Sequence, residues 1–429
     1  MAALPTPVTV LAGARLADGS RVDVHIDGET IAAVLPAGSA PASAIDADGM
    51  LLLPAPAEPH AHLDKALSWD LIEPPAGDLE RAIESWVAHT ETMTEESIAE
   101  RARAQALAML QRGTTAIRSH VDILRTGDPL RGVRALLRVR EELAGLVDIE
   151  LVALASHLSP DADIERALDA GIDLVGGAPH LAPEPGAELR RLVALATRRD
   201  VGADLHTDES LHGPLTILEY ARLVRGWSNN ASAGHCVRLG TLPLPELAAV
   251  VAELRASDLG VISLPITNLY LQGWDDPVST PRGLTALRAL LDAGVRLGAG
   301  ADNVRDPFNP VGRSDALETA SLLVTAGHLG LAEAYDAVSI GARAVMRLPE
   351  TRIAAGSRAE LLAVRATSLA DAIANAPADR LVIHRGRLVA RSSTSVEVAA
   401  ARRPAVAPQP EPARHPAPAP HPEQTRRAS

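Results

Sequence analysis

The sequence predicts an α/β protein in which a (β/α)8 TIM barrel is joined to a small β-sandwich domain built from both chain ends. Two observations predict this fold. Between about residues 51 and 300, eight short apolar segments typical of buried strands alternate with segments of helical pattern. Short strands divided by turn residues occupy residues 7–53 and return at residues 352–391.

The expected domain boundaries follow from these changes of pattern. Residues 1–53 and 351–391 are predicted to form the two parts of the β-sandwich, and residues 54–350 the barrel. After Ser392 the chain is rich in Ala, Pro and Arg. Residues 392–429 are therefore predicted to be a disordered tail, because such a segment cannot bury a core.

Each expected element has its own local signal. Strands of the sandwich are expected at residues 8–11, 22–26, 31–34, 360–364 and 380–384, divided by turns such as Asp18-Gly19. The first barrel strand is expected to include the apolar run before His60, and the others are expected at residues 115–121, 149–154, 174–177, 201–206, 232–237, 260–264 and 295–300. Helices are expected between most of them, for example at residues 94–111, 131–144, 186–199, 244–255 and 282–293.

A His-x-His motif, His60-Ala61-His62, directly follows the apolar run Met50–Pro54. Alternation along a strand puts residues i and i+2 on the same side, so both imidazoles are expected to point the same way. Two imidazoles side by side can chelate a borderline metal such as zinc. Taken alone, the motif is equally compatible with two polar residues in a loop.

Two later residues complete such a metal site, and a third lies beside it. His206 ends the fifth predicted strand, Glu209 lies three residues further on, and Asp302 follows the eighth strand. His60, His62, His206 and Asp302 are therefore predicted to bind one metal ion. A zinc-like ion lowers the pKa of its water toward ~7, and Glu209 is placed to move protons above it.

Two further roles and their alternatives remain open. Asp302 can accept the proton of the water, and His235 can hold or polarise the attacking oxygen. Taken singly, His206 is compatible with a satisfied core histidine, Glu209 with a solvated loop charge, and His235 beside Cys236 with buried packing. Their coincidence at strand ends favours a site, because active-site residues of such barrels collect there.

Four residues near the predicted mouth receive no role from the sequence: Asp64, Lys65, His120 and Asp122. Lys65 is the only lysine of the chain. Two-metal barrel hydrolases commonly bridge their ions with a modified lysine at the fourth strand, and this chain has none there. One metal ion is therefore expected.

The composition of the chain limits the kinds of partner that the protein can bind. The formal net charge of −13 argues against nucleic acid and anionic membranes. Cys236 is the only cysteine, so no internal disulfide is possible. The chain shows no signal-peptide pattern and no apolar run of 18 residues, so we expect a cytoplasmic protein that acts on a small molecule. Whether it forms a homo-oligomer is left open.

Six stretches, in the same order as in the family, resemble bacterial cytosine deaminases of the amidohydrolase superfamily over about residues 7–391. They are Glu58–Asp64, Arg118–Asp122, Val175–His180, His206–Glu209, Asn268–Gly273 and Asp302–Phe308. The resemblance implies a barrel with a flanking β-sandwich and one zinc or iron ion. It also implies hydrolytic release of ammonia from an amino-substituted ring.

The substrate-binding residues that the resemblance implies differ from the family pattern at three positions. Ser156 stands where these deaminases have a glutamine that reads the pyrimidine edge, and Asn303 replaces a second aspartate. Phe308 stands where tryptophan is usual. A pocket that hydrogen-bonds its substrate discriminates strongly between ring edges, so these changes bear on which heterocycle is accepted.

The sequence thus predicts a metal-dependent hydrolytic deaminase of cytosine or a related amino-substituted nitrogen heterocycle. The same chemistry would also cleave a cyclic amide or an N-alkylamino substituent. An inactive paralogue that only binds ligand is the alternative from another class. The deaminase architecture with H-x-E and P-C-x-x-C zinc ligation is excluded by the single cysteine.

Overall fold

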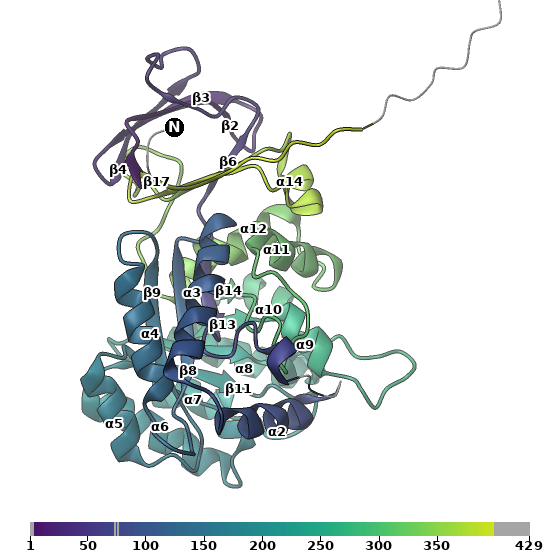
Figure 1. Cartoon of the computed structure of the whole chain (residues 1–429). Coiled ribbons are helices and arrows are strands. Elements are labelled where there is room, and N and C mark those ends of the chain that lie inside the picture. The colour runs from purple at the N-terminus through teal and green to yellow at the C-terminus, as the bar shows by residue number, and fades with distance from the viewer. Residues whose placement is uncertain (1–3, 73, 75–76, 399–429) are drawn as a thin grey trace, which may run out of the picture. The chain divides into compact units, whose positions relative to one another are not determined.

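Eight parallel strands follow one another in sequence order around a barrel in the computed structural model, which describes residues 4–72, 74 and 77–398 (Figure 1). They are β7 (Ala57–Ala61), β8 (Ala116–Asp122), β9 (Asp148–Ala155), β10 (Leu174–Gly177), β11 (Gly202–Thr207), β12 (Ala231–His235), β13 (Gly260–Ser263) and β14 (Leu297–Ala299). A parallel bridge between Ala61 and Asp302 joins the first strand to the residues that follow the last one. The predicted TIM barrel is confirmed.

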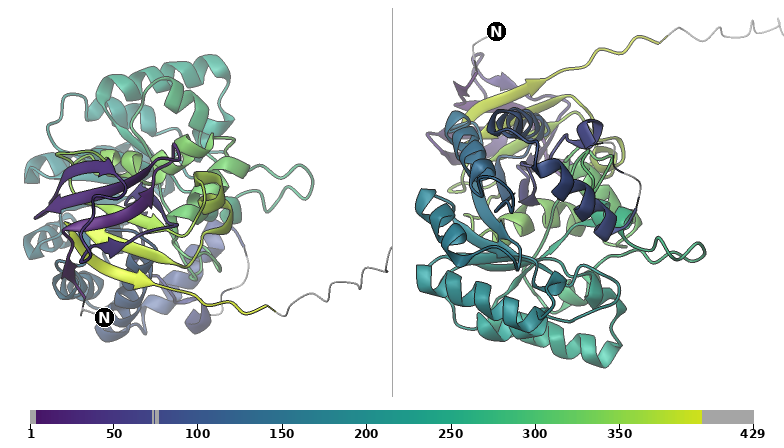
Figure 2. Two further views of the ribbon diagram at one scale, coloured as in Figure 1. Left: turned by 90° about the horizontal axis from the view of Figure 1, so that it is seen from above. Right: turned by 60° about the horizontal axis from the view of Figure 1, so that its bottom comes forward.

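Helices cover the outside of the barrel (Figure 2, right). The α-helices are α1 (Trp69–Ile72), α2 (Leu79–Thr90), α3 (Glu95–Gln111), α4 (Arg131–Glu142), α5 (Asp161–Ala170), α6 (Pro185–Arg199), α7 (Ile217–Leu223), α8 (Leu244–Ser257), α9 (Pro265–Leu271), α10 (Leu287–Asp292), α11 (Ala316–Thr325), α12 (Leu331–Val338), α13 (Ile340–Val345) and α14 (Leu369–Asn375). The 3₁₀ segments are η1 (Pro179–Leu181) and η2 (Val237–Thr241). None of the described helices combines the length and the apolar character needed to cross a membrane.

A side-chain hydrogen bond and a glycine conformation explain where two of the helices begin and end. The Thr94 side chain accepts a hydrogen bond from the Ser97 amide at the start of α3, and α5 stops at Gly171, whose φ of 113° suits glycine. One predicted helix, residues 282–293, is shorter than expected because α10 begins only at Leu287. Gly283 has a φ of +64°, a left-handed conformation that cannot continue a right-handed helix.

The small domain is one nine-stranded sheet, within the described residues, that unites both chain ends. Its strands are β1 (Thr6–Pro7), β2 (Val10–Arg15), β3 (Arg21–Asp27), β4 (Thr30–Pro36), β5 (Ile45–Asp46), β6 (Leu51–Pro54), β15 (Leu361–Val364), β16 (Arg380–His384) and β17 (Arg387–Ser392). Figure 2 (left) shows the N-terminal strands in purple beside the C-terminal strands in yellow. Buried residues of both groups, among them Leu11, Ile31 and Ile383, form one core.

One expectation about the first barrel strand was wrong. The apolar run before His60 is β6, which pairs with β15 in the small domain, whereas His60 lies on the separate strand β7. Ala55 and Pro56 separate the two strands. Proline lacks the amide hydrogen that a sheet ladder requires, so Pro56 favours a break between them.

The barrel and the small domain belong to one compact unit, residues 1–393. Leu362 and Val382 of the small sheet are buried in the same apolar cluster as the barrel residues. Arg385 Nη2 also pairs with Asp148 Oδ1 at 2.7 Å. Most of the predicted tail, residues 399–429, lies outside the described residues.

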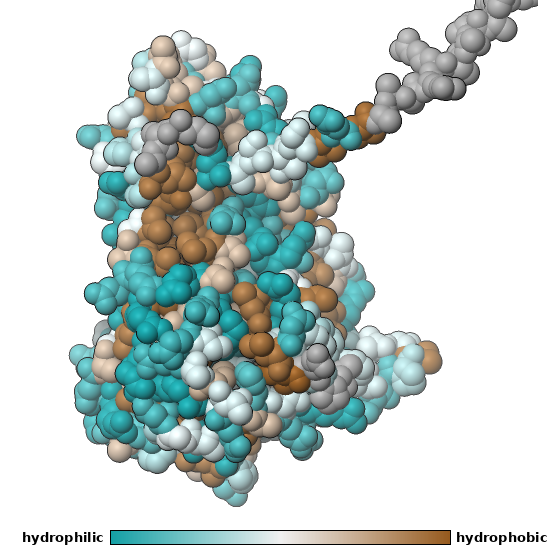
Figure 3. Space-filling view, viewed as in Figure 1, coloured by the Kyte–Doolittle hydropathy of each residue, from teal (hydrophilic) through white to brown (hydrophobic). Residues whose placement is uncertain are grey.

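On the face seen in Figure 3, hydrophilic side chains cover most of the barrel and apolar side chains gather in separate patches.

Candidate active site

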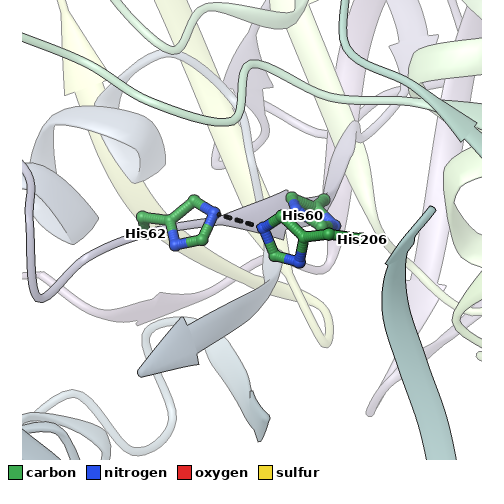
Figure 4. Close-up of side chains that lie close together, drawn as sticks. All are labelled: His60, His62 and His206. Carbon is green, nitrogen blue, oxygen red and sulfur yellow. Dashed lines mark hydrogen bonds between the residues drawn. The ribbon is translucent and has the colours of Figure 1, made fainter. Parts of the chain in front are cut away.

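Three histidines and one aspartate meet at one end of the barrel. His60 Nε2 and His62 Nε2 lie 3.3 Å and 3.1 Å from His206 Nε2 (Figure 4). His62 Nε2 also lies 3.2 Å from Asp302 Oδ1, and His60 Nε2 lies 3.9 Å from the same oxygen. All four side chains are buried. The structure therefore brings together the four residues that the sequence predicts as metal ligands.

The backbone around these residues is shaped to bring them together. Gly234 of β12 faces the His60 ring, and a Cβ there would lie 2.7 Å from His60 Cε1, so only glycine fits. His235 and Asp302 have φ angles of 66° and 59°. Non-glycine residues in this left-handed region are strained by on the order of 1–3 kcal/mol each. Such strain is typical of functional sites.

A buried carboxyl group links the two ends of the barrel sheet. Glu58 accepts hydrogen bonds from the amides of His60 (3.1 Å) and Ala301 (2.9 Å). Burial raises the pKa of Glu58 to about 8. Glu58 thus ties the strand that bears His60 to the loop that bears Asp302.

The four residues fit a divalent cation. Burial, helped by the Lys65 charge, lowers the pKa of His62 well below its ordinary value, and burial with nearby imidazoles does the same for His206. Both rings are therefore neutral, as ligation requires. The two carboxylate oxygens of Asp302 are buried and accept no hydrogen bond from the described residues. Neutral imidazole nitrogens and a free carboxylate converging on one point form a donor set typical of zinc or iron.

Glu209 and His235 lie beside the four predicted ligands. Glu209 Oε1 is 3.4 Å from His235 Nδ1, and His235 Nδ1 is 4.0 Å from Asp302 Oδ2. Burial, followed by the negative charge of Asp302, raises the pKa of Glu209 well above its ordinary value. Burial lowers the pKa of His235 to about 3. The site thus contains a carboxyl group that favours its protonated form next to a neutral imidazole.

A second layer of polar residues supports the ligands from inside the barrel. Asp204 Oδ1 lies 3.8 Å from His60 Nδ1 and 3.8 Å from His120 Nε2. Arg118, fully buried, pairs with Asp204 Oδ2 at 2.8 Å and with Glu150 at 2.5 Å. His60, His120 and Asp204 also form a group with metal-ligand spacing. The buried guanidinium compensates the charge of Asp204, whose Oδ1 faces His60 Nδ1 beyond hydrogen-bond distance.

A cavity of about 650 Å³ opens onto the site. His62, His206, Glu209 and His235 line it. Ser156, Asn303 and Phe308, the predicted substrate-binding residues, line it too, so the structure places them together with the predicted ligands. A volume of this size is typical of pockets that bind small molecules.

Comparison with known proteins assigns the family. A family model with the description "Amidohydrolase family" matches residues 92–390 of the chain. The chain belongs to the amidohydrolase family.

Individual relatives cover nearly the whole chain. It is 29% identical over 389 residues to a pterin deaminase of Rhizobium rhizogenes, covering 87% of this chain and 88% of that protein. It is 27% identical over 379 residues to N-isopropylammelide isopropyl amidohydrolase of Pseudomonas sp., covering 82% and 89%. The structure of 5-methylcytosine deaminase from Klebsiella pneumoniae with 5-fluorocytosine superimposes with a TM-score of 0.82 at 26% identity, covering 91% of this chain and 99% of that chain.

Several residues of this amidohydrolase site were not predicted. Asn268 Nδ2 lies 3.1 Å from His235 Nδ1, and Gln272 donates to the Glu209 carbonyl at 2.8 Å. His180 Nδ1 lies 3.2 Å from the His206 carbonyl. All three lie in the stretches that resemble the family, which is the signal that could have identified them. Helix α2, which lines the cavity with Ile83, Trp86 and Val87 among others, has no such signal.

Proposed function

We propose that this amidohydrolase hydrolytically deaminates an amino-substituted nitrogen heterocycle, cytosine or a related ring, with one divalent zinc or iron ion held by His60, His62, His206 and Asp302. The observation that supports this most is the convergence of these four donors beside a buried carboxyl group. The likeness to two deaminases supports the same reaction class.

The reaction requires a water to add to the ring carbon that bears the amino group. The new C–O bond forms, the exocyclic C–N bond breaks, and ammonia leaves while a ring carbonyl forms. A divalent ion in the site supplies the acidified water that makes this addition possible at neutral pH. The protein must then move protons from that water to the ring and to the leaving nitrogen.

The positions of three side chains fit these transfers. Asp302, with unpaired oxygens, accepts a proton from the attacking water. Glu209 is buried and favours its protonated form, so it can deliver its proton to the ring nitrogen. It then takes up the proton held by Asp302 and passes it to the departing amine, and the second proton of the water, released as the ring carbonyl forms, restores the Glu209 carboxyl group. His235, whose Nδ1 lies 3.1 Å from Asn268 Nδ2, is held where it can polarise the attacking oxygen.

A second candidate reaction is hydrolysis of an N-alkylamino substituent. The N-isopropylammelide relative is 27% identical, and the cavity of about 650 Å³ has apolar side chains in its wall. Leu124, Leu154 and Leu181 line the cavity and would contact an apolar extension of the substrate. The chemistry at the ring carbon is the same in both cases, and only the leaving group differs.

The test is turnover by purified, metal-loaded protein on cytosine, 5-methylcytosine, pterin and N-isopropylammelide. Released ammonia and released isopropylamine are quantified separately. Ammonia from at least one of the first three compounds supports the proposal, and isopropylamine with no ammonia supports the second candidate. Metal-loaded protein that binds these compounds without releasing either amine would instead support the inactive paralogue.

A further inference from the structure

Lys65 is a buried cation at the wall of the cavity. It is the only lysine of the chain, and 4% of it is exposed. Its Nζ lies 2.6 Å from Asp122 Oδ1 and 3.6 Å from Asp64 Oδ2. The two carboxylates stabilise the charged form of Lys65, an ammonium group with three hydrogens to donate.

Within the described residues, the ammonium makes one short hydrogen bond, to Asp122 Oδ1 at 2.6 Å. Nζ lies 3.4 Å from His62 Nδ1. When Nε2 of this neutral imidazole faces the predicted metal, Nδ1 carries the ring hydrogen and cannot accept one. Asp122 therefore accepts one hydrogen, Asp64 at 3.6 Å contributes its charge but no hydrogen bond, and Lys65, which borders the cavity, keeps a hydrogen for a ligand.

The ammonium is held firmly in place. The Trp86 indole Nε1 donates to Asp122 Oδ2 at 2.6 Å, and the Lys65 Nζ lies 5.3 Å from the centre of that indole ring. Helix α2, which covers the cavity, is thus connected to Lys65 through Asp122. A cation fixed from three sides presents its free donor at one defined position.

Two other residues predicted to read the substrate edge already use part of their hydrogen-bonding capacity. The Asn303 amide donates to Asp306 Oδ2 at 2.7 Å. Ser156 Oγ accepts from the Leu158 amide at 3.1 Å. Among the described residues that line the cavity, Lys65 is the one buried cationic side chain. The His62 imidazole connects it to the predicted metal site, because Nδ1 lies 3.4 Å from Lys65 Nζ and Nε2 lies 3.2 Å from Asp302 Oδ1.

We propose that Lys65 is a specificity-determining residue that donates a hydrogen bond to a ring carbonyl oxygen of the substrate. The substrate class is then an amino-oxo heterocycle. Its carbonyl carbon lies opposite the carbon that bears the hydrolysed amino group, or one ring position closer to it. This inference rests on the proposed function. It does not depend on which amino-oxo ring is used.

The experiment compares substrate pairs that differ only in that carbonyl: cytosine with 4-aminopyrimidine, and pterin with 2-aminopteridine. Ammonia release gives kcat and KM for the parent and for Lys65→Met, and metal content and Tm are measured on each. Arg125→Met removes one exposed cation near the same mouth and serves as the charge-matched control. Lys65→Met/Asp122→Asn, which leaves no uncompensated Asp122 charge, is used if Lys65→Met does not fold.

Loss of one charge-assisted hydrogen bond changes kcat/KM by roughly 10²-fold. We expect Lys65→Met to lose that much on the oxo member of the pair and less than about threefold on its deoxo partner, with metal content unchanged. The parent's preference for the carbonyl should persist in Arg125→Met. An undiminished preference in Lys65→Met overturns this inference alone, whereas a parent that releases ammonia from none of the compounds overturns the proposed function as well.

Discussion

Replacing Glu209 by glutamine tests the proton transfers directly. Glutamine keeps the size of the side chain and leaves the Gln272 bond to the residue 209 carbonyl in place, but it cannot give up and regain a carboxyl proton. Glu209 lies next to His235 rather than among the four predicted ligands. We therefore expect metal content and Tm to stay unchanged, while kcat falls roughly 10²–10⁴-fold.

That loss corresponds to about 3–5 kcal/mol of transition-state stabilisation. The assay is steady-state ammonia release at saturating substrate, with metal content measured on the same preparation. Glu246→Gln, at an exposed glutamate on α8 that does not line the cavity, is the matched control and should retain parental kcat. Near-parental kcat in Glu209→Gln would refute the proton-transfer role, and loss of metal would show that Glu209 is needed for ligation instead.

Three further predictions concern the metal, the substrate and stability. His62→Ala should reduce metal from about one ion per chain to a small fraction by elemental analysis, and full occupancy would contradict the ligand assignment. Ser156→Gln with Asn303→Asp should raise cytosine turnover relative to the other heterocycles. If the parent already prefers cytosine and the double substitution only lowers its turnover, the specificity argument is contradicted. Burial alone would lower the pKa of His384, but its contacts with Asp148 and Glu360 raise it to about 8. Because the folded-state pKa lies above the ordinary 6.5, the contribution of about 2 kcal/mol is fully present below pH ~6.5 and is lost as the pH rises through about 8. His384→Gln should therefore lower the free energy of unfolding at pH 6 but hardly at pH 9, and equal losses at both would contradict this linkage.

The gathering of His60, His206 and Asp302 could be predicted from the sequence because barrel topology is highly constraining. Once the strands alternate with helices, residues at their C-terminal ends must share one mouth, however far apart they are in the chain. His60 and His206 are 146 positions apart and their Nε2 atoms lie 3.3 Å apart. The strand that bears His60 was nevertheless assigned wrongly, because an apolar run does not reveal which of two sheets it joins.

The surroundings of the site were beyond prediction because they depend on tertiary contacts. Lys65 and Asp122 lie 57 positions apart, and nothing in either segment signals that they pair. Trp86 reaches Asp122 from a helix that the alternation of strands and helices does not require. Arg118, which pairs with Asp204, resembles an ordinary strand residue until its burial is known.

Titration of metal-free protein with zinc or iron(II), followed by ammonia release from the best substrate, tests the central claim most directly. Activity should rise from near zero in proportion to added metal and stop rising at about one equivalent per chain, and His62→Ala should show no comparable rise. Ammonia release that is unchanged in metal-free protein, or a fully loaded site that hydrolyses no heterocycle of the panel, would contradict the account.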